Sequence, residues 1–198
     1  MILYIYSLAC FLLPGTLWII SYRKKSKKLN NRIRHIVWSY IFMFYGFTAM
    51  HDAAGIGTIW DFFNEGITGG INLIPFSSVS ARLYMLNILN VFMFMPLGFL
   101  LPFIWERYRS FIKVLGTGFM MSFLIEICQL FCSRATDVDD LIMNTSGALV
   151  GYLCWKMFRR IFTGAGAKSI ELGRYEALVY LFGGMLGIVL LYNWRFIY

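Results

Sequence analysis

Residues 126–151 read EICQLFCSRATDVDDLIMNTSGALVG and place nearly all of the chain's concentrated polar chemistry between two apolar runs. Glu126 is the single charged residue between Val114 and Ser133. A carboxylate in hydrocarbon costs several kcal/mol unless it is protonated, paired or hydrated. Glu126 is therefore a candidate functional residue, and the rest of the chain is expected to form a membrane scaffold around this stretch.

The composition indicates a polytopic membrane protein. Hydrophobic residues make up 59% of the 198 residues and the mean hydropathy is +0.66, well above the values of soluble domains. The net charge of +8 does not point to nucleic acid, because the basic residues lie in short segments between apolar runs. The four cysteines lack the spacing of a zinc site or a disulfide framework, so we interpret them as apolar packing residues.

Six apolar segments predict an all-α fold, a membrane bundle of about six transmembrane helices. The spans are expected at Met1–Tyr22, Ile36–Ala54, Tyr84–Trp105, a fourth helix ending at Phe131, Asp139–Phe158 and Ala177–Trp194. A short amphipathic helix beginning at Thr58 is expected to lie on the outer interface.

Basic residues set the predicted orientation. They gather in the loops after the first, third and fifth spans, and of the 18 Lys and Arg residues only Arg82, Arg134 and Arg195 lie elsewhere. Because cytoplasmic loops carry an excess of Lys and Arg, both termini are expected on the outer side of the membrane.

The third span and the segment before it carry unusual residues. Residues 71–76 are expected to form an extended or turning segment, because the residue before Pro75 disfavours helix. Within the span, Pro96 removes a backbone hydrogen bond, so a kink or a hydrated backbone is expected. Asn90 shares a face with Gly98. The asparagines of this span either hydrogen-bond to neighbouring helices or line a site for a ligand.

A second polar face is predicted on the fifth span. This face consists of Asp140, Asn144, Gly147 and Gly151, which are spaced 4, 3 and 4 residues apart. The GxxxG pattern of the two glycines allows close helix approach, and the fourth span is the simplest partner. Glu126 and Gln129, three residues apart on that fourth span, would then face Asn144.

An outer turn closes this predicted polar centre. It holds Arg134 and three aspartates, and Thr136 or Asp137 is expected to cap the fifth helix. One interpretation is a hydrogen-bonded hairpin in which Arg134 pairs with an aspartate and Asn144 satisfies Glu126. The other, which we favour, is a binding or catalytic site at the outer leaflet, because six polar or ionisable groups converge at one depth.

These residues fall in four ordered motifs, and at them the chain resembles the VanZ-like family, named for a protein associated with resistance to the glycopeptide teicoplanin. The motifs are NLIPF at 72–76, NVFMFMPLG at 90–98, ExxQ at 126–129 and ATDVDDxxxNTxG at 135–147. The resemblance covers about residues 36–160. It leaves an N-terminal helix with a basic loop, 1–35, and a basic loop with a C-terminal helix, 161–198, as additions.

The resemblance implies a multi-pass membrane protein of the bacterial cell envelope, located in the plasma membrane. It does not imply a settled mechanism. The family's motif residues correspond here to Asn72, Pro75, Asn90, Pro96, Glu126, Gln129, Asp137, Asp140, Asn144 and Gly147. Arg134 and Asp139 are weaker matches to the family pattern.

Three functions compete. The first is a non-enzymatic protein that binds an outer-leaflet amphiphile, either a lipid-linked wall precursor or a lipoglycopeptide, and lowers antibiotic action. The second is a hydrolase or transferase of lipid phosphates, with Asp137 and Asp140 holding Mg²⁺ or Ca²⁺ and Glu126 as acid or base. The third is a proton-coupled transporter that uses Glu126, although no inverted repeat is evident. We adopt the first, which needs no cofactor, and assign no catalytic residue.

Overall fold

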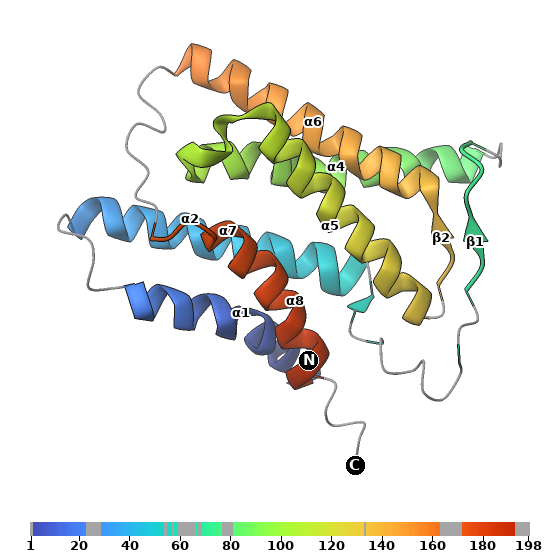
Figure 1. Ribbon diagram of the computed structural model, residues 1–198, viewed down its shortest axis with the longest axis horizontal. Coiled ribbons are helices and arrows are strands. Elements are labelled where there is room, and N and C mark those ends of the chain that lie inside the picture. The colour runs from blue at the N-terminus through green and yellow to red at the C-terminus, as the bar shows by residue number, and fades with distance from the viewer. Residues whose placement is uncertain are drawn as a thin grey trace. The chain divides into compact units, whose positions relative to one another are not determined.

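The computed structural model describes residues 2–22, 29–53, 55–56, 58, 66, 69–76, 81–132, 134–162 and 172–192 (Figure 1). These residues form six helices. The first five are α1 (Ile2–Tyr22), α2 (Leu29–Phe47), α4 (Ala81–Ile104), α5 (Phe111–Phe131) and α6 (Val138–Ile161). The sixth is a C-terminal helical run made of α7 (Glu176–Leu178), η4 (Val179–Gly183), α8 (Gly184–Gly187) and η5 (Ile188–Tyr192).

The prediction of an all-α fold with six helices is confirmed. The ends of several helices differ from the predicted ones. α2 begins at Leu29 instead of Ile36, inside the predicted basic loop, and it continues into a π-helical turn, η1 (Thr48–Ala53). A short 3₁₀ helix, η3 (Glu106–Arg109), joins α4 to α5. The predicted interfacial helix that begins at Thr58 lies largely outside the described residues.

Three of the described helices are long and apolar enough to cross a membrane, at Ile2–Tyr22, Met85–Ile104 and Phe111–Phe131. The C-terminal run Glu176–Tyr192 is apolar but shorter. α4 continues without interruption through Pro96 and Pro102. By length and composition these three helices could span a membrane. A kink at Pro96 stays a prediction.

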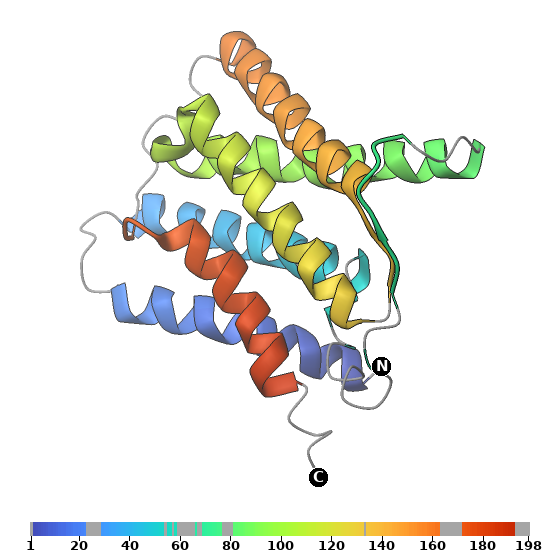
Figure 2. The same cartoon turned by 45° about the vertical axis from the view of Figure 1, so that its right-hand side comes forward.

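Two short strands were not predicted. β1 (Ile71–Asn72) and β2 (Thr136–Asp137) pair in parallel, with Ile71 opposite Thr136 and Asn72 opposite Asp137. Figures 1 and 2 show the two strands side by side next to the start of α6. The expectation of an extended backbone before Pro75 is correct, but its hydrogen-bonding partner lies far along the chain, where no sequence pattern indicates it.

The contacts divide the chain into two compact units, one of Met1–Trp60 with Lys168–Tyr198 and one of Asp61–Ala167. The division predicted from the sequence, 1–35, 36–160 and 161–198, stays a prediction. In the first unit α1 packs against α2 and against the C-terminal run. Gly184 lies against the ring of Phe11, and Gly15 lies against Met43 and Tyr180. Small residues thus bring these helices close together.

In the second unit the closest helix pair is α4 with α6, which corrects one prediction. Gly147 lies against the Val91 carbonyl of α4, and Gly151 lies against the Met95 carbonyl. The predicted partner of this GxxxG face was the preceding helix, α5. The physical reason for the correction is that Gly98 of α4 meets the backbone of Ala148, so small residues stand on both faces of the α4–α6 contact and the backbones approach closely.

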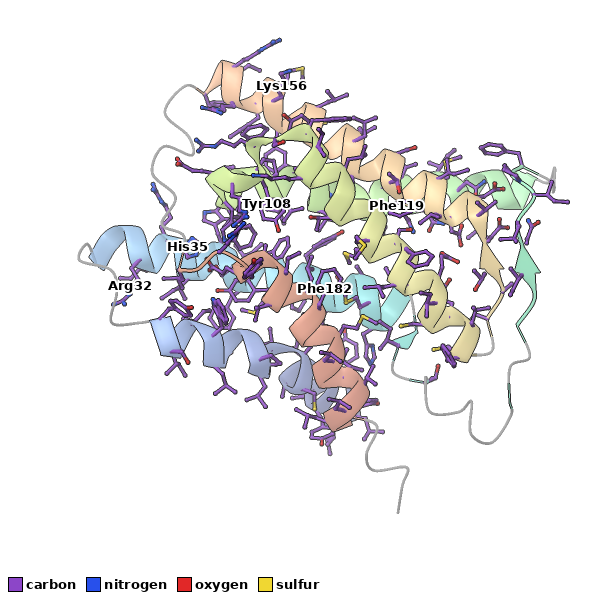
Figure 3. All side chains as sticks on the ribbon, in the orientation of Figure 1. Arg32, His35, Tyr108, Phe119, Lys156 and Phe182 are labelled. Atoms are coloured by element: carbon purple, nitrogen blue, oxygen red, sulfur yellow. The ribbon has the colours of Figure 1, made fainter. Side chains whose placement is uncertain are left out.

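α6 has opposite charges at its two ends. Asp139 and Asp140 stand in its first turn, and Arg159 and Arg160 stand in its last. Figure 3 shows Lys156 near the same basic end, away from β2. This order complements the helix dipole, whose positive end is at the N-terminus. It also separates an acidic end of the second unit from a basic end.

Candidate functional site

Glu126 is tied to the strand that leads into α6. The backbone N–H of Asp137 donates to Glu126 Oε2 at 3.2 Å, and Thr136 Oγ1 donates to the Glu126 carbonyl at 3.0 Å. Glu126 is 5% exposed. Since Glu126 lies near the end of α5 and Asp137 precedes α6, these two bonds hold the ends of the two helices together.

Of the two predicted N-cap candidates, Thr136 and Asp137, the N-cap of α6 is Asp137. Its Oδ1 accepts from the Asp139 N–H at 2.9 Å, one of the helix N–H groups that have no partner within the helix. Its Oδ2 accepts from Asn72 Nδ2 at 3.1 Å, so the side chains of the paired strands also bond. Asn72 and Asp137 are thus brought together, and their bond fixes the segment before Pro75 against the start of α6.

Asp139, a weaker match to the family pattern, bonds to the backbone of the turn after Pro75. Its Oδ1 accepts from the Phe76 N–H at 2.8 Å, and it is 7% exposed. Phe76 has φ 54°, a left-handed conformation that residues other than glycine seldom adopt. The turn after Pro75 therefore closes on the first turn of α6.

Asn90 joins α4 to α6. Its Nδ2 donates to Asp140 Oδ1. The interpretation that the asparagines of this helix bond to a neighbouring helix therefore applies to Asn90. Gly98, Gly147 and Gly151 lie in the close contact of the same two helices, so they set the separation across which Asn90 reaches Asp140.

The hairpin interpretation expected Asn144 to bond to Glu126. Among the described residues its side-chain partner is Ser122 instead. Its Nδ2 donates to Ser122 Oγ at 3.0 Å, and the two residues are 2% and 0% exposed. Ser122 stands one helical turn before Glu126 on the same face of α5. Ser122 was not predicted as part of the site, although its i, i+4 spacing to Glu126 indicates that it shares this polar face.

Three oxygen atoms in this region are buried without a hydrogen-bond partner: Glu126 Oε1, Gln129 Oε1 and Asn144 Oδ1. No hydrogen bond joins Gln129 to Glu126 among the described residues. A buried acceptor that lacks a donor costs about 1–3 kcal/mol. We call Glu126, Gln129, Asn144, Ser122 and the residues bonded around them, Asn72, Asn90, Asp137, Asp139 and Asp140, the α5–α6 polar cluster.

The carboxylates of this cluster bond to amides. The donors to the three aspartates are backbone N–H groups and the side chains of Asn72 and Asn90. Arg134 is exposed, and its expected ion pair with an aspartate stays a prediction. Residues 126–140 thus contain four acidic side chains and one basic side chain, Arg134.

A metal site receives little support from this geometry. Asp137 and Asp140 were the candidate ligands for Mg²⁺ or Ca²⁺. Within the described ranges, no group of three or more His, Cys, Asp or Glu side chains is placed to hold an ion. Both oxygens of Asp137 already accept hydrogen bonds.

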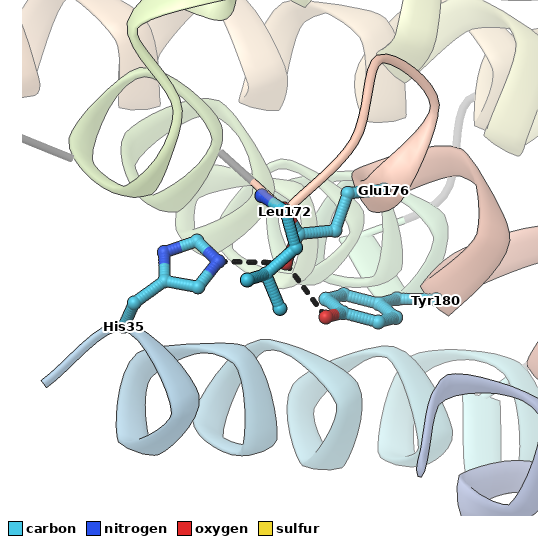
Figure 4. Close-up of polar contacts among 4 residues, drawn as sticks. All are labelled: His35, Leu172, Glu176 and Tyr180. Carbon is cyan, nitrogen blue, oxygen red and sulfur yellow. Dashed lines mark hydrogen bonds and ion pairs between the residues drawn. The ribbon is translucent and has the colours of Figure 1, made fainter. Parts of the chain in front are cut away.

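A second buried polar cluster, in the first unit, was missed by the sequence analysis (Figure 4). Glu176 Oε1 lies 2.6 Å from His35 Nε2 and accepts from the Tyr180 hydroxyl at 2.7 Å. Glu176 Oε2 accepts from the Leu172 N–H at 2.9 Å. The available signal was Glu176 directly before the last apolar run, with Tyr180 one turn later. We call these four residues the His35 cluster.

Comparison with known proteins gives one consistent result. The sequence model of the VanZ/LLP1 family matches residues 35–159. Protein VanZ of Enterococcus faecium is 30% identical over 126 residues, which are 63% of this chain and 71% of that protein. No solved structure matches the chain. The family match runs from α2 to near the end of α6 and so contains the whole α5–α6 polar cluster.

Proposed function

Since the chain belongs to the VanZ/LLP1 family of membrane proteins, we propose that it binds an outer-leaflet amphiphile at the α5–α6 polar cluster. The amphiphile is a lipid-linked wall precursor or an acyl-bearing glycopeptide antibiotic. Binding there contributes to the teicoplanin resistance that the family resemblance implies. The proposed role is one of binding, and it assigns no catalytic step to Glu126 or to the aspartates.

The observation that carries this proposal is the unpaired Oε1 of Glu126. The carboxylate is almost fully buried near the end of an apolar helix, and among the described residues only one of its oxygens has a donor. A charged group at such a depth is retained where a function needs it, because burial without full pairing is unfavourable. A second molecule that completes its hydrogen bonds explains why the residue is there.

The proposal includes a topology of six crossings with both termini outside. The acidic start of α6 then faces the outer leaflet, and its basic end, Lys156 to Arg160, faces the cytoplasm. This orientation is supported by the charge distribution along α6. Attaching a reporter that is modified only outside the cell to either terminus tests it.

Susceptibility to teicoplanin tests the function. A sensitive Gram-positive host would express wild type, Glu126→Gln or Asp140→Asn, each at equal membrane abundance. Glu106→Gln is the matched control, because Glu106 is an exposed carboxylate of the same unit outside the cluster, paired with Arg109 at 3.1 Å. We expect wild type and Glu106→Gln to protect the host and the two cluster variants to lose protection. Wild type that behaves like the empty vector contradicts the proposal.

A further inference from the structure

We infer that the chain inserts the apolar side chains of residues 71–76 among the acyl chains of the bilayer. These residues, INLIPF, run from β1 through the turn after Pro75, and we call them the 71–76 segment. The inference concerns the contact between the protein and membrane lipids. It does not depend on which ligand the α5–α6 polar cluster binds.

The 71–76 segment presents four large apolar side chains to its surroundings. Between 52% and 73% of the surface is exposed at each of Ile71, Leu73, Ile74 and Phe76. The polar side chain among them, Asn72, bonds instead to an aspartate of β2. A contiguous apolar patch on a protein surface marks a contact with another protein or with a membrane.

The backbone of the segment is bonded to the protein. Its first part pairs with β2. The Ile74 N–H donates to Asn72 Oδ1 at 3.2 Å, and the Phe76 N–H donates to Asp139 Oδ1 at 2.8 Å. Between them, Pro75 has no N–H to satisfy. Non-helical backbone lies at membrane depth only where the protein satisfies its polar groups, and the amide donors of residues 74–76 meet this condition.

The depth of the segment follows first from α5. β1 pairs with β2, and β2 bonds to Glu126 through the Thr136 hydroxyl and the Asp137 N–H. Glu126 lies five residues before the end of the apolar helix Phe111–Phe131, which is about 8 Å along the helix axis. The strand pair therefore lies beside the last turns of a helix that is long enough to cross a membrane, and not beyond its end.

α4 gives the same depth independently. Asn90 lies five residues after the start of the apolar stretch Met85–Ile104, again about 8 Å along the axis. Its side chain bonds to Asp140 in the first turn of α6. Since the Phe76 N–H bonds to Asp139 in that same turn, the 71–76 segment is held at this level by two helices of membrane-spanning length.

Acyl chains are the partner that fits both the depth and the exposed side chains. Moving apolar surface from water into hydrocarbon is favourable by about 25 cal/mol per Å², so four exposed apolar side chains stabilise this position. An amphiphile whose tail lies against the segment has its head group beside Asn72 and Asp139, and it can reach the α5–α6 polar cluster from the bilayer. That route rests on the proposed function, whereas the position of the segment does not.

Spin-label accessibility in lipid nanodiscs tests the inference. A nitroxide would be attached to Ile74→Cys in a protein whose four natural cysteines are replaced by alanine. Oxygen, which concentrates among acyl chains, and a water-soluble nickel chelate would serve as relaxation agents. The matched controls are Leu89→Cys, exposed within the apolar stretch of α4, and Glu106→Cys, exposed in η3. We expect the ratio of oxygen to nickel collision rates at Ile74→Cys to be close to that at Leu89→Cys and several-fold above that at Glu106→Cys.

A second measurement keeps the natural cysteines. The photoreactive residue p-benzoylphenylalanine would replace Phe76, whose ring is similar in shape, and the protein would be irradiated in its membrane. We expect mass spectrometry to find an adduct of one chain with one lipid. The same residue in place of Leu89 is the control and should also give a lipid adduct.

Each outcome supports or overturns the inference. A label at Ile74→Cys that nickel reaches as readily as at Glu106→Cys overturns it, because the segment then lies in water. A label that neither agent reaches, or an adduct of position 76 with a protein, also overturns it, because a protein surface then covers the segment. The absence of a lipid adduct at position 76 when position 89 gives one has the same meaning. The susceptibility assay reports separately, so lipid contact without antibiotic protection contradicts only the proposed function.

Discussion

Two buried glutamates in this chain have opposite surroundings. Glu176 is 1% exposed, and both of its oxygens have donors, from His35 and Tyr180 on one side and from the Leu172 N–H on the other. Glu126 is 5% exposed, and in the part of the chain that the structure describes only one of its oxygens has a donor. Two glutamates of similar burial thus differ in their hydrogen bonding. Glu176 is fully hydrogen-bonded and joins α2 to the C-terminal run in one unit, whereas Glu126 is incompletely bonded in the other. Hydrogen-bond completeness, more than burial, separates the structural role from the functional one.

The largest expected effect on stability is at Glu176, whose two carboxylate oxygens both have hydrogen-bond donors. Glu176→Ala leaves the Tyr180 hydroxyl, His35 Nε2 and the Leu172 N–H without their common acceptor inside the first unit. Removing one partner of a buried network costs about 3–5 kcal/mol. We expect the midpoint of thermal unfolding of the purified protein to fall by roughly 10 °C.

The control for Glu176→Ala is Glu106→Gln, at an exposed carboxylate, which should leave the midpoint within about 2 °C of wild type because exposed ion pairs contribute little. A midpoint for Glu176→Ala that matches this control would show that the His35 cluster does not stabilise the first unit.

An intermediate effect is expected from the helix contact beneath the α5–α6 polar cluster. Gly147→Val places a side chain against the Val91 carbonyl and the Phe94 side chain of α4. Overpacking of this kind costs about 1–3 kcal/mol, which corresponds to a fall of roughly 5 °C in the unfolding midpoint. The matched control is Gly116→Ala on α5, where an added Cβ meets nothing within 4 Å and helix propensity favours alanine. If Gly147→Val unfolds at the same temperature as Gly116→Ala and wild type, then α4 and α6 are not in close contact at Gly147.

A smaller effect is expected when one of several donors is removed. Tyr180→Phe takes away the hydroxyl that donates to Glu176 Oε1 but leaves His35 and the Leu172 N–H in place. A single hydrogen bond contributes about 1 kcal/mol, so the unfolding midpoint should fall by roughly 3 °C. A fall as large as that of Glu176→Ala would mean that Tyr180 organises the His35 cluster and is not simply one of its donors.

The sequence predicted most of the helices and part of the α5–α6 polar cluster. Long apolar runs and caps are local signals, so the helices and Asp137 as N-cap were accessible from residues close together in the chain. Glu126 was accessible because a lone carboxylate in an apolar run is conspicuous. These signals depend on the order of the residues alone.

The missed features depend on residues that are far apart in the sequence. Asn72 and Asp137 are separated by 65 positions, and His35 and Glu176 by 141. The GxxxG face of α6 could equally serve either neighbour, and its pairing with α4 is decided by Gly98, on another helix. The bond between Asn144 and Ser122 likewise depends on the rotation of α6 against α5. Spacing along one helix does not contain that information.

The smallest effect on stability, and the sharpest test of the comparison, is expected from Glu126→Gln. Gln retains an oxygen that can accept from the Asp137 N–H, and it carries no charge. The unfolding midpoint should therefore stay within about 2 °C of wild type or rise, because a buried, incompletely bonded carboxylate is removed. Teicoplanin protection should be lost in the same variant, since the carboxylate whose hydrogen bonds the ligand is proposed to complete has been removed. A Glu126→Gln protein that is strongly destabilised would place Glu126 with Glu176 among the structural carboxylates. Loss of protection at unchanged stability would show that Glu126 has a functional role, unlike the structural role of Glu176.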